Sequence, residues 1–261
     1  MPEPTDADRR DGRTDWPDNL ISARTALEQG LRGWPKAGEA TPGPPIPAPA
    51  GRGGAQRIPR PLNARAGGPP PWVDLPWELR QPTVADVRAV MAGLTPAVPS
   101  PREGGPLASR PSAVLAPLYD EDGLANVILT RRTWALRTHQ GEVSFPGGRV
   151  DPGETSIDAA RREAKEEIDL DSSMVEIIGE LDHLSTVSSQ SFIVPYVGVL
   201  PGRPETHPNP DEVDAVLHVP LAELADPANF REEIWTFPDG NDRSIYFFEL
   251  VGDTVWGMTA A

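Results

Sequence analysis

The segment GEVSFPGGRVDPGETSIDAARREAKEEIDLD, residues 141–171, places glycine turns beside a dense group of acidic residues. If its second half is helical, Glu163, Glu166 and Glu167 stand at positions i, i+3 and i+4 and share one face. Like charges at this spacing repel each other unless a positive charge lies among them. We therefore expect the chain to fold so that this helix face binds a divalent metal ion.

The local sequence predicts where this helix begins and which side it buries. Thr155 is an N-cap residue, and Asp158 stands in the reciprocal position of a capping box. Apolar residues recur at steps of three and four and predict a face that docks on a sheet: Ile157, Ala160, Ala164 and Ile168. Upstream, FPGG ends a strand in a turn where backbone can approach a ligand closely. This combination indicates a binding site, because an exposed charged helix needs no such turn.

Proline and charge divide the chain into two parts. Of the 32 prolines, 21 lie at or before Pro111, whereas residues 112–261 hold 27 acidic side chains against 10 basic ones. Residues 1–70 are predicted to form a disordered Pro/Gly-rich tail, since such a composition buries too little apolar surface to offset its ordering entropy. Within this tail, helix is expected only around residues 19–31.

Residues 71–111 are predicted to contain a short helix followed by a linker. Thr83 is its expected N-cap, and its apolar face is expected to comprise Val84, Val87, Val90 and Met91.

Several short apolar runs downstream predict strands. Residues 113–119 and 125–132 are joined by DEDG, a hairpin signal. Further strands are expected over residues 175–184, 191–200, 212–220, 233–237 and 244–250, with short helical stretches at 220–226 and 255–261. The predicted class is α+β, with one mixed sheet and few helices.

Composition excludes several kinds of protein. With no cysteine, the chain can form no disulfide framework, thiolate zinc site or thiol nucleophile, and the four histidines lack the spacing of a histidine metal site. No apolar run approaches the roughly 18 residues of a spanning helix, so we expect a cytoplasmic protein that does not enter a membrane. A net charge of −15 argues against nucleic acid as a partner. The oligomeric state is not predicted.

Residues 148–170 resemble the Nudix box, G-x5-E-x7-R-E-U-x-E-E-x-G-U, in which U is aliphatic. The matching residues are Gly148, Glu154, Arg162, Glu163, Ala164, Glu166, Glu167 and Leu170. Asp169 stands where the family has glycine, so the left-handed end of the helix is expected to be weaker. The resemblance implies a Nudix hydrolase domain over residues 112–261, with the Nudix fold, a mixed β-sheet sandwiched between helices (an α/β/α sandwich).

The preceding segment, LTRRTWALRTHQGEVSFPGG, resembles the additional signature of coenzyme A pyrophosphatases of the Nudix superfamily, L-T-x-R-[SA]-x3-R-x3-G-x3-F-P-G-G. The residues in register are Leu129, Thr130, Arg132, Arg137, Gly141, Phe145, Pro146, Gly147 and Gly148, while Thr133 replaces Ser or Ala. The family continues past the WGMTA segment with a terminal helix.

This resemblance implies hydrolysis of the diphosphate bond of coenzyme A or acyl-coenzyme A, with Mg²⁺ or Mn²⁺ as cofactor. The expected products are 3′,5′-ADP and 4′-phosphopantetheine or its acyl form. The expected metal ligands are Glu163, Glu166, Glu167 and the carbonyl oxygen of Gly148.

The resemblance also implies roles for the residues around the metal. Arg162 is expected to orient the acids by pairing with Glu154. The expected substrate contacts are Arg132, Arg137 and Gly147, because arginine presents a planar fork to phosphate oxygens. The general base stays open between Glu163 or Glu166 of the helix and Glu205 or Glu212 of a later loop, with Glu212 the better loop candidate.

Two alternatives remain at the level of sequence. One is a Nudix hydrolase of another nucleoside diphosphate derivative, such as ADP-ribose or a dinucleotide. The other is a Nudix-fold binding module without turnover, which the departure at Asp169 favours and the intact set of carboxylates opposes.

Overall fold

The computed structural model describes residues 48, 50–99, 111–136, 138–185, 192–237 and 240–261. The predicted helix around residues 19–31, most of the predicted linker, and Arg137 lie outside the described residues.

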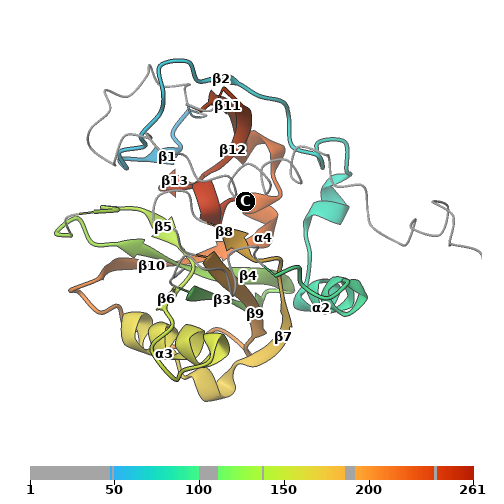
Figure 1. Cartoon of the computed structure of the whole chain (residues 1–261). Helices are drawn as coiled ribbons and strands as arrows, with labels where there is room; N and C mark the ends of the chain where they lie inside the picture. Colours follow the sequence, from blue (N-terminus) through green and yellow to red (C-terminus); the bar gives the residue numbers. More distant parts are fainter. Residues whose placement is uncertain (1–47, 49, 100–110, 137, 186–191, 238–239) are drawn as a thin grey trace, which may run out of the picture.

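The larger sheet is mixed and lies in the middle of the molecule (Figure 1). Its main strands, in spatial order, are β10 (Val213–Pro220), β4 (Leu124–Arg132), β3 (Pro111–Glu121), β9 (Phe192–Val199) and β7 (Glu176–Glu180). Three short strands extend it: β5 (Val143–Ser144) on β4, β6 (Gly147–Arg149) on β3, and β8 (Leu184–Ser185) on β9. Only the β3–β9 pair is parallel among these. The predicted hairpin is present, and Asp122 and Gly123 form its turn with positive φ.

A second sheet lies above the first in Figure 1. Its strands, in spatial order, are β14 (Thr254–Trp256), β12 (Asp242–Glu249), β11 (Phe230–Thr236) and β2 (Arg65–Ala66). Beside it, β1 (Gly53–Gly54) pairs in parallel with β13 (Val251–Gly252). The strands expected near residues 233–237 and 244–250 therefore exist, but they belong to a separate sheet that the strand pattern did not predict.

The larger sheet has helices on both faces, as the predicted α/β/α sandwich requires. Helix α3 (Ser156–Ile168) packs on one face, whereas α2 (Val84–Gly93) and α4 (Leu221–Leu224) lie toward the other. Among the described residues, the remaining helices are of the 3-10 type: η2 (Trp77–Arg80), η3 (Ser172–Met174), η4 (Pro227–Asn229) and η5 (Gly257–Thr259). None of the described helices is long and apolar enough to cross a membrane.

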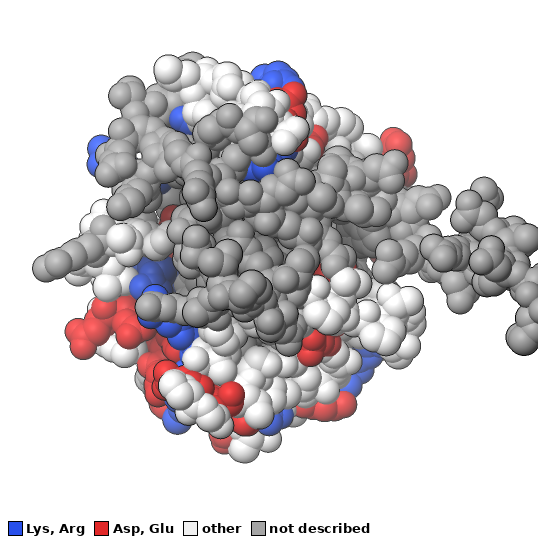
Figure 2. All heavy atoms as spheres, in the orientation of Figure 1, with Lys and Arg blue, Asp and Glu red and all other residues white. Residues whose placement is uncertain are grey.

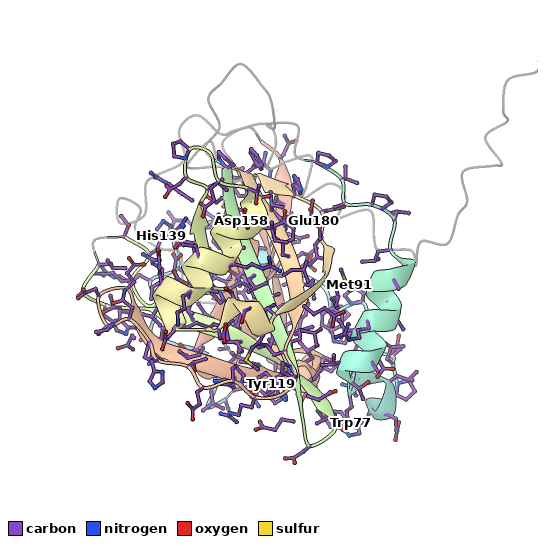
Figure 3. The ribbon with its side chains drawn as sticks, turned by 90° about the horizontal axis from the view of Figure 1, so that it is seen from below. Trp77, Met91, Tyr119, His139, Asp158 and Glu180 are labelled. Atoms are coloured by element: carbon purple, nitrogen blue, oxygen red, sulfur yellow. The ribbon has the colours of Figure 1, made fainter. Side chains whose placement is uncertain are left out.

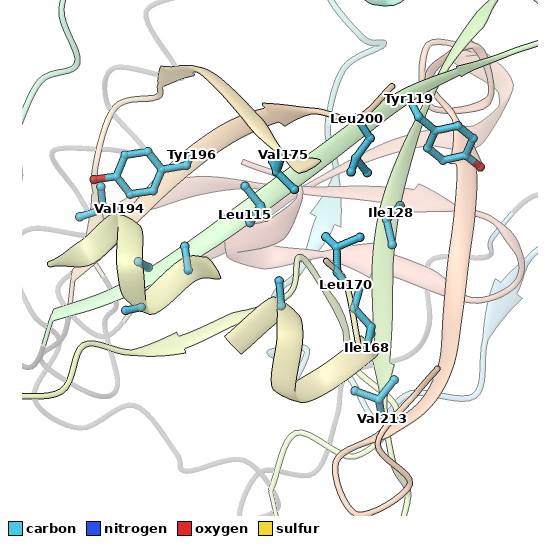
Figure 4. Packing of buried hydrophobic residues seen from close by; sticks show 14 of the residues in the cluster. Leu115, Tyr119, Ile128, Ile168, Leu170, Val175, Val194, Tyr196, Leu200 and Val213 are labelled. Carbon is cyan, nitrogen blue, oxygen red and sulfur yellow. The ribbon is translucent and has the colours of Figure 1, made fainter. Parts of the chain in front are cut away.

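Alternation along β3 and β4 divides the core between the two faces. On the α3 side, Leu115 and Ile128 pack with Ile168 and Leu170 of the helix and its exit, as Figure 4 shows. On the opposite side, Leu118, Val127 and Leu129 pack with residues of α2, α4 and the second sheet. The predicted mixed sheet between helices is thus confirmed. On one of its faces, the covering layer contains α2, α4 and the second sheet.

Helix α2 begins as predicted at Thr83, whose hydroxyl accepts a hydrogen bond from the amide of Asp86 while the Asp86 carboxylate accepts from the Thr83 amide. Val84, Val87 and Met91 pack against the core. The prediction for Val90 is wrong, because its side chain is 63% exposed. At a helical period of 3.6 residues, position 90 lies well outside the arc occupied by positions 84, 87 and 91.

The prediction of a disordered tail is wrong for residues 50–70. Here β1 and β2 pair with strands of the C-terminal part of the chain, and Arg60 is buried. The Arg60 guanidinium donates two hydrogen bonds of 2.7 Å to Glu233, which is fully buried. Composition did not reveal this order, because it comes from backbone pairing and one buried ion pair with distant residues.

We predict that Arg60→Ala lowers the free energy of unfolding by about 2–4 kcal/mol, because it removes a partner of a buried carboxylate. Glu233 keeps hydrogen bonds to other groups, including one of 2.7 Å from Trp235 Nε1, so unfolding should remain cooperative. The measurement is urea denaturation. Arg57→Ala, an exposed arginine of the same segment, is the matched control and should change stability by less than about 0.5 kcal/mol. Equal effects of the two substitutions would contradict the prediction.

Candidate active site

The acidic helix α3 is held against the sheet by its apolar side, as predicted. Ala160, Ala164 and Ile168 are fully buried, and Ile157 packs at the edge of the same cluster. The Thr155 hydroxyl accepts a hydrogen bond from the Asp158 amide at 3.2 Å, so the N-cap is also confirmed. Only half of the capping box forms, because the shorter Asp158 side chain accepts from the Thr155 hydroxyl and not from its amide. Figure 3 shows α3 from outside, with Asp158 near its first turn.

Arg162 lies at the centre of the acidic face. Its guanidinium donates two hydrogen bonds to Glu154, at 2.9 and 3.1 Å, which is the pair predicted from the sequence. Its Nη1 atom also donates to Glu163 and to Glu166, at 3.0 Å each, and Nη2 donates to the carbonyl of Arg149 at 2.9 Å. The Arg162 guanidinium holds the pKa of Glu154 below its ordinary value. One cation thereby ties the acidic face of α3 to the turn that precedes it.

The glycine pair after β5 lets backbone approach these acids. A Cβ atom on Gly148 would lie 2.3 Å from Glu163 Oε1, so any larger residue would displace this carboxylate. At Gly147 a Cβ atom would lie 2.3 Å from the carbonyl oxygen of Ala113. The Gly147 amide donates a hydrogen bond of 3.3 Å to Glu167 Oε2. The turn and the helix therefore form one compact site, as the FPGG motif indicated.

Glu167 is the most deeply buried acid of this site, with 4% of its surface exposed. Burial raises its pKa to about 7, against the partly compensating hydrogen bond from Gly147. Burial also raises the pKa of Glu163, and the negative charges of Glu166 and Glu212 add to this effect. Two carboxylates that are costly to ionise thus lie next to each other. A cation among them would favour their charged forms.

Arg132 and Glu212 complete the site from the sheet. Arg132, at the end of β4, stabilises the charge on Glu167, and its Nε atom is buried without a hydrogen-bond partner among the described residues. Glu212 acts on both Glu163 and Glu167, and its carbonyl accepts a hydrogen bond of 2.9 Å from the Thr133 amide. The structure therefore brings both of these predicted residues to the acidic face of α3.

Glu205 is placed elsewhere. It lines a pocket of about 560 Å³ at the C-terminal end of α3, together with Lys165, Asp169 and Arg203. Within the described part of the chain, no interaction joins Glu205 to Glu163 or Glu167. Figure 2 shows acidic atoms gathered over the region of α3, with basic atoms beside them.

The loop before Glu212 is anchored by backbone contacts that sequence reasoning missed. The amides of His207 and Asn209 donate to the carbonyls of Ile168 and Glu167, at 2.9 and 2.8 Å. The Asn209 side chain also accepts a hydrogen bond from the Asp211 amide at 3.2 Å. An Asn-Pro-Asp sequence is a turn signal that predicts such a local bond, but nothing in it predicts the contact with α3.

The donor chemistry of the site suits a hard divalent cation. All of its acidic groups offer oxygen, and the Glu163 carboxylate lies against the backbone of Gly148. In the described ranges, no three His, Asp or Glu side chains form a ready-made metal site, and Glu163 and Glu166 are bonded to Arg162. The ligand set of Gly148, Glu163, Glu166 and Glu167 therefore stays a prediction.

Asp169 stands where the box motif has glycine, and it adopts the left-handed backbone conformation. Its φ and ψ angles are 56° and 25°, and its amide donates to the carbonyls of Ala164 and Lys165. Its carboxylate pairs with Lys165 and lies 3.5 Å from His207 Nδ1. The helix end is thus formed despite the substitution, with side-chain contacts in place of glycine's conformational freedom.

Comparisons with known proteins match the part of the chain that contains this site. The NUDIX domain family matches residues 109–239. The uncharacterized Nudix hydrolase NudL of Photorhabdus laumondii is 36% identical over 153 residues, which cover 58% of this chain and 80% of that protein. NudL of Klebsiella pneumoniae strain 342 is 38% identical over 157 residues, covering 59% and 79%. The solved Nudix hydrolase RenU of M. smegmatis gives a TM-score of 0.39 at 22% identity, covering 45% of this chain and 74% of that one.

We predict that Glu167→Gln reduces the pH dependence of stability in EDTA. The pKa of Glu167 is about 7 in the folded protein against 4.5 ordinarily, so the unfolded chain loses this proton first as pH rises. Stability should therefore fall by roughly 2–3 kcal/mol between pH 4.5 and 7 on account of Glu167. Urea denaturation over this range should show the fall in the parent protein and a smaller one in the variant. Glu166→Gln, which alters an exposed acid of the same helix, should retain the fall; identical curves for the parent and Glu167→Gln would refute the assignment.

We predict that Asp169→Gly raises the thermal midpoint by about 2–4 °C, because glycine adopts the left-handed region without a Cβ penalty. Metal-dependent activity should be unchanged, since the Asp169 side chain points to Lys165 and His207. Differential scanning calorimetry measures the midpoint. Asp171→Gly, two residues on, is the control and should not raise it. A lower midpoint for Asp169→Gly would show that its ion pairs outweigh the backbone strain.

Proposed function

The chain belongs to the Nudix hydrolase family, and on this premise we propose that it hydrolyses the diphosphate bond of coenzyme A or acyl-coenzyme A with Mg²⁺ or Mn²⁺. As a Nudix hydrolase it is a pyrophosphohydrolase that acts on nucleoside diphosphate derivatives with the help of divalent metal ions. The identity of the substrate and of the ion is what we add. The proposed products are 3′,5′-ADP and 4′-phosphopantetheine or its acyl form.

The observation that carries this proposal is the state of Arg132. Its Nε atom is buried without a partner among the described residues, beside the acids of α3. Arg162, in contrast, already bonds to Glu154, Glu163 and Glu166. Arg132 is therefore a cation near the acids with its Nε donor unpaired, and we assign its guanidinium to a phosphate oxygen of the substrate. It occupies the arginine position of L-T-x-R in the coenzyme A pyrophosphatase signature, which supports coenzyme A over other diphosphates.

We assign the remaining roles as follows. Glu163, Glu166, Glu167 and the Gly148 carbonyl would hold the divalent cation, which when bound neutralises diphosphate oxygens and makes water more acidic. Arg162 orients these acids through its two bonds to Glu154. Gly147 and Arg137 remain proposed substrate contacts.

Glu212 is our choice for the general base. It acts electrostatically on Glu163 and Glu167, its side chain is exposed, and its backbone is bonded next to Arg132. Glu163 and Glu166 share one guanidinium nitrogen and are less free to accept a proton. Glu205 lines the pocket beside Lys165 and Asp169, and no described interaction joins it to Glu163 or Glu167. These positions support Glu212, which takes the proton of the attacking water.

The acidic composition supports a small-molecule substrate over nucleic acid, and the absence of cysteine from the sequence supports a cytoplasmic location.

The experiment is a substrate panel with Mg²⁺ or Mn²⁺ and identification of products by mass. We expect coenzyme A to yield 3′,5′-ADP and 4′-phosphopantetheine. Dephospho-coenzyme A should show a kcat/KM about 10–100-fold lower, because one charge-assisted contact to the 3′-phosphate is lost. A higher kcat/KM for ADP-ribose or a dinucleotide would end the coenzyme A assignment. Glu167→Gln should remove metal-dependent hydrolysis of every substrate while the protein remains folded.

A further inference from the structure

Strand β10 is not paired regularly with β4. Val213 is opposite Arg132 and Ala215 is opposite Arg131, so Asp214 is an extra residue that forms a β-bulge. Val216 packs in the core under α3, and strict alternation would place Asp214 on that same face. Instead Val213 is buried there, at 2% exposure. The bulge therefore turns Val213 into the core under α3 and keeps Asp214 out of it.

Arg131 bonds to this bulged residue and to Asp253, which precedes β14 of the second sheet. Its Nε and Nη2 atoms donate to Asp214 Oδ2 at 3.0 and 2.8 Å. Its Nη1 atom donates to both carboxylate oxygens of Asp253, at 3.2 and 3.0 Å. Asp253 is 5% exposed and lies between β13 and β14, where its carbonyl accepts a bond from the Leu250 amide. All three nitrogens of the Arg131 guanidinium are thereby engaged, and the bulge is tied to a buried carboxylate between β13 and β14.

We call the group of Arg131, Asp214 and Asp253 the Arg131 clamp. The bulge connects this clamp to the active site through the neighbouring residues of β4 and β10. Residues 131 and 132 are neighbours on β4, so their side chains leave opposite faces of the sheet. Arg132 acts on Glu167, whereas Arg131 reaches Asp253. On the other strand, Glu212 precedes the bulge by two residues, and its carbonyl is bonded to Thr133. A shift of one residue in this pairing would carry Glu212 away from the acids of α3.

We propose that Arg131 is a positioning residue for the active site: by bonding Asp214 and Asp253 it fixes the bulge that presents Glu212 beside Arg132. Position 131 is the unrestricted x of the L-T-x-R signature, so the clamp is a feature of this chain's own residues. The inference rests on the proposed role of Glu212 in diphosphate hydrolysis and is independent of coenzyme A being the substrate.

The test is a double-mutant cycle with the panel substrate that the parent protein hydrolyses fastest. Asp214→Ala removes one side of the clamp at a partly exposed residue and leaves Arg131 paired with Asp253. We expect kcat to fall about 10–100-fold, with KM changed much less and the thermal midpoint within about 2 °C. Added to Glu212→Gln, the substitution should cause no further loss, because both act through the same carboxylate. Arg131→Met should behave likewise in kcat, with lower stability because Asp253 loses its partner.

A second readout does not require turnover. If the clamp fixes the register, the Thr133 amide, which bonds to the Glu212 carbonyl, should exchange its hydrogen at least 10-fold faster in Asp214→Ala. Arg88→Met, which removes an exposed pair between Arg88 of α2 and Glu176 of β7, is the control and should alter neither kcat nor this exchange. Multiplicative losses in the cycle, a silent Glu212→Gln, or unchanged Thr133 exchange would each overturn the inference. Preference for another diphosphate substrate would affect only the coenzyme A assignment.

Discussion

Docking of helix α3 on the larger sheet carries one of its acidic side chains into the protein interior. Helix α3 needs its apolar side in the core, and Glu167 is carried into near-complete burial along with it. An isolated buried carboxylate is strongly disfavoured, so its surroundings must supply compensation. Here these are the Gly147 amide and the charge of Arg132, while Arg162 compensates the acids nearer the surface. The glycine turn and the ends of β4 and β10 are arranged around this requirement.

Four arginines show how an acidic chain distributes a limited number of cations. Arg162 and Arg132 lie at the acidic face of α3, the first saturated by carboxylates and the second with a free donor. Arg131, on the opposite face of the larger sheet, and Arg60, in the second sheet region, are each bonded to a buried carboxylate that is not part of this face. Replacement by lysine would not be conservative at Arg131 or Arg162, because both bond in several directions at once through a planar group. The placement of each guanidinium, and not the net charge, determines its role.

What the sequence predicts well is what depends on near neighbours. The N-cap Thr155, the buried face of α3, the hairpin turn at Asp122 and the Arg162–Glu154 pair all arise within one or two turns of chain. The pairing of β2 with β11, the order of residues 50–70 and the burial of Arg60 against Glu233 depend on partners more than 150 residues apart. No periodicity within either segment encodes such a pairing. The prediction that Val90 lies on the apolar face of α2 was wrong for a different reason. In a short helix with few apolar residues, the sequence pattern defines poorly which residues face the core.

At the candidate site, residue types and spacing predicted which side chains take part but not how they share their bonds. Glu154 receives two hydrogen bonds from Arg162, whereas Glu163 and Glu166 share a single nitrogen of it. Glu166 is also the more exposed of these two, at 57% against 16%. A divalent cation competing with Arg162 would therefore draw Glu163 and Glu166 away more readily than Glu154. Arg162 would keep its link to the preceding turn through Glu154, so the acidic face could take up an ion while the glycine turn stays in register with the helix.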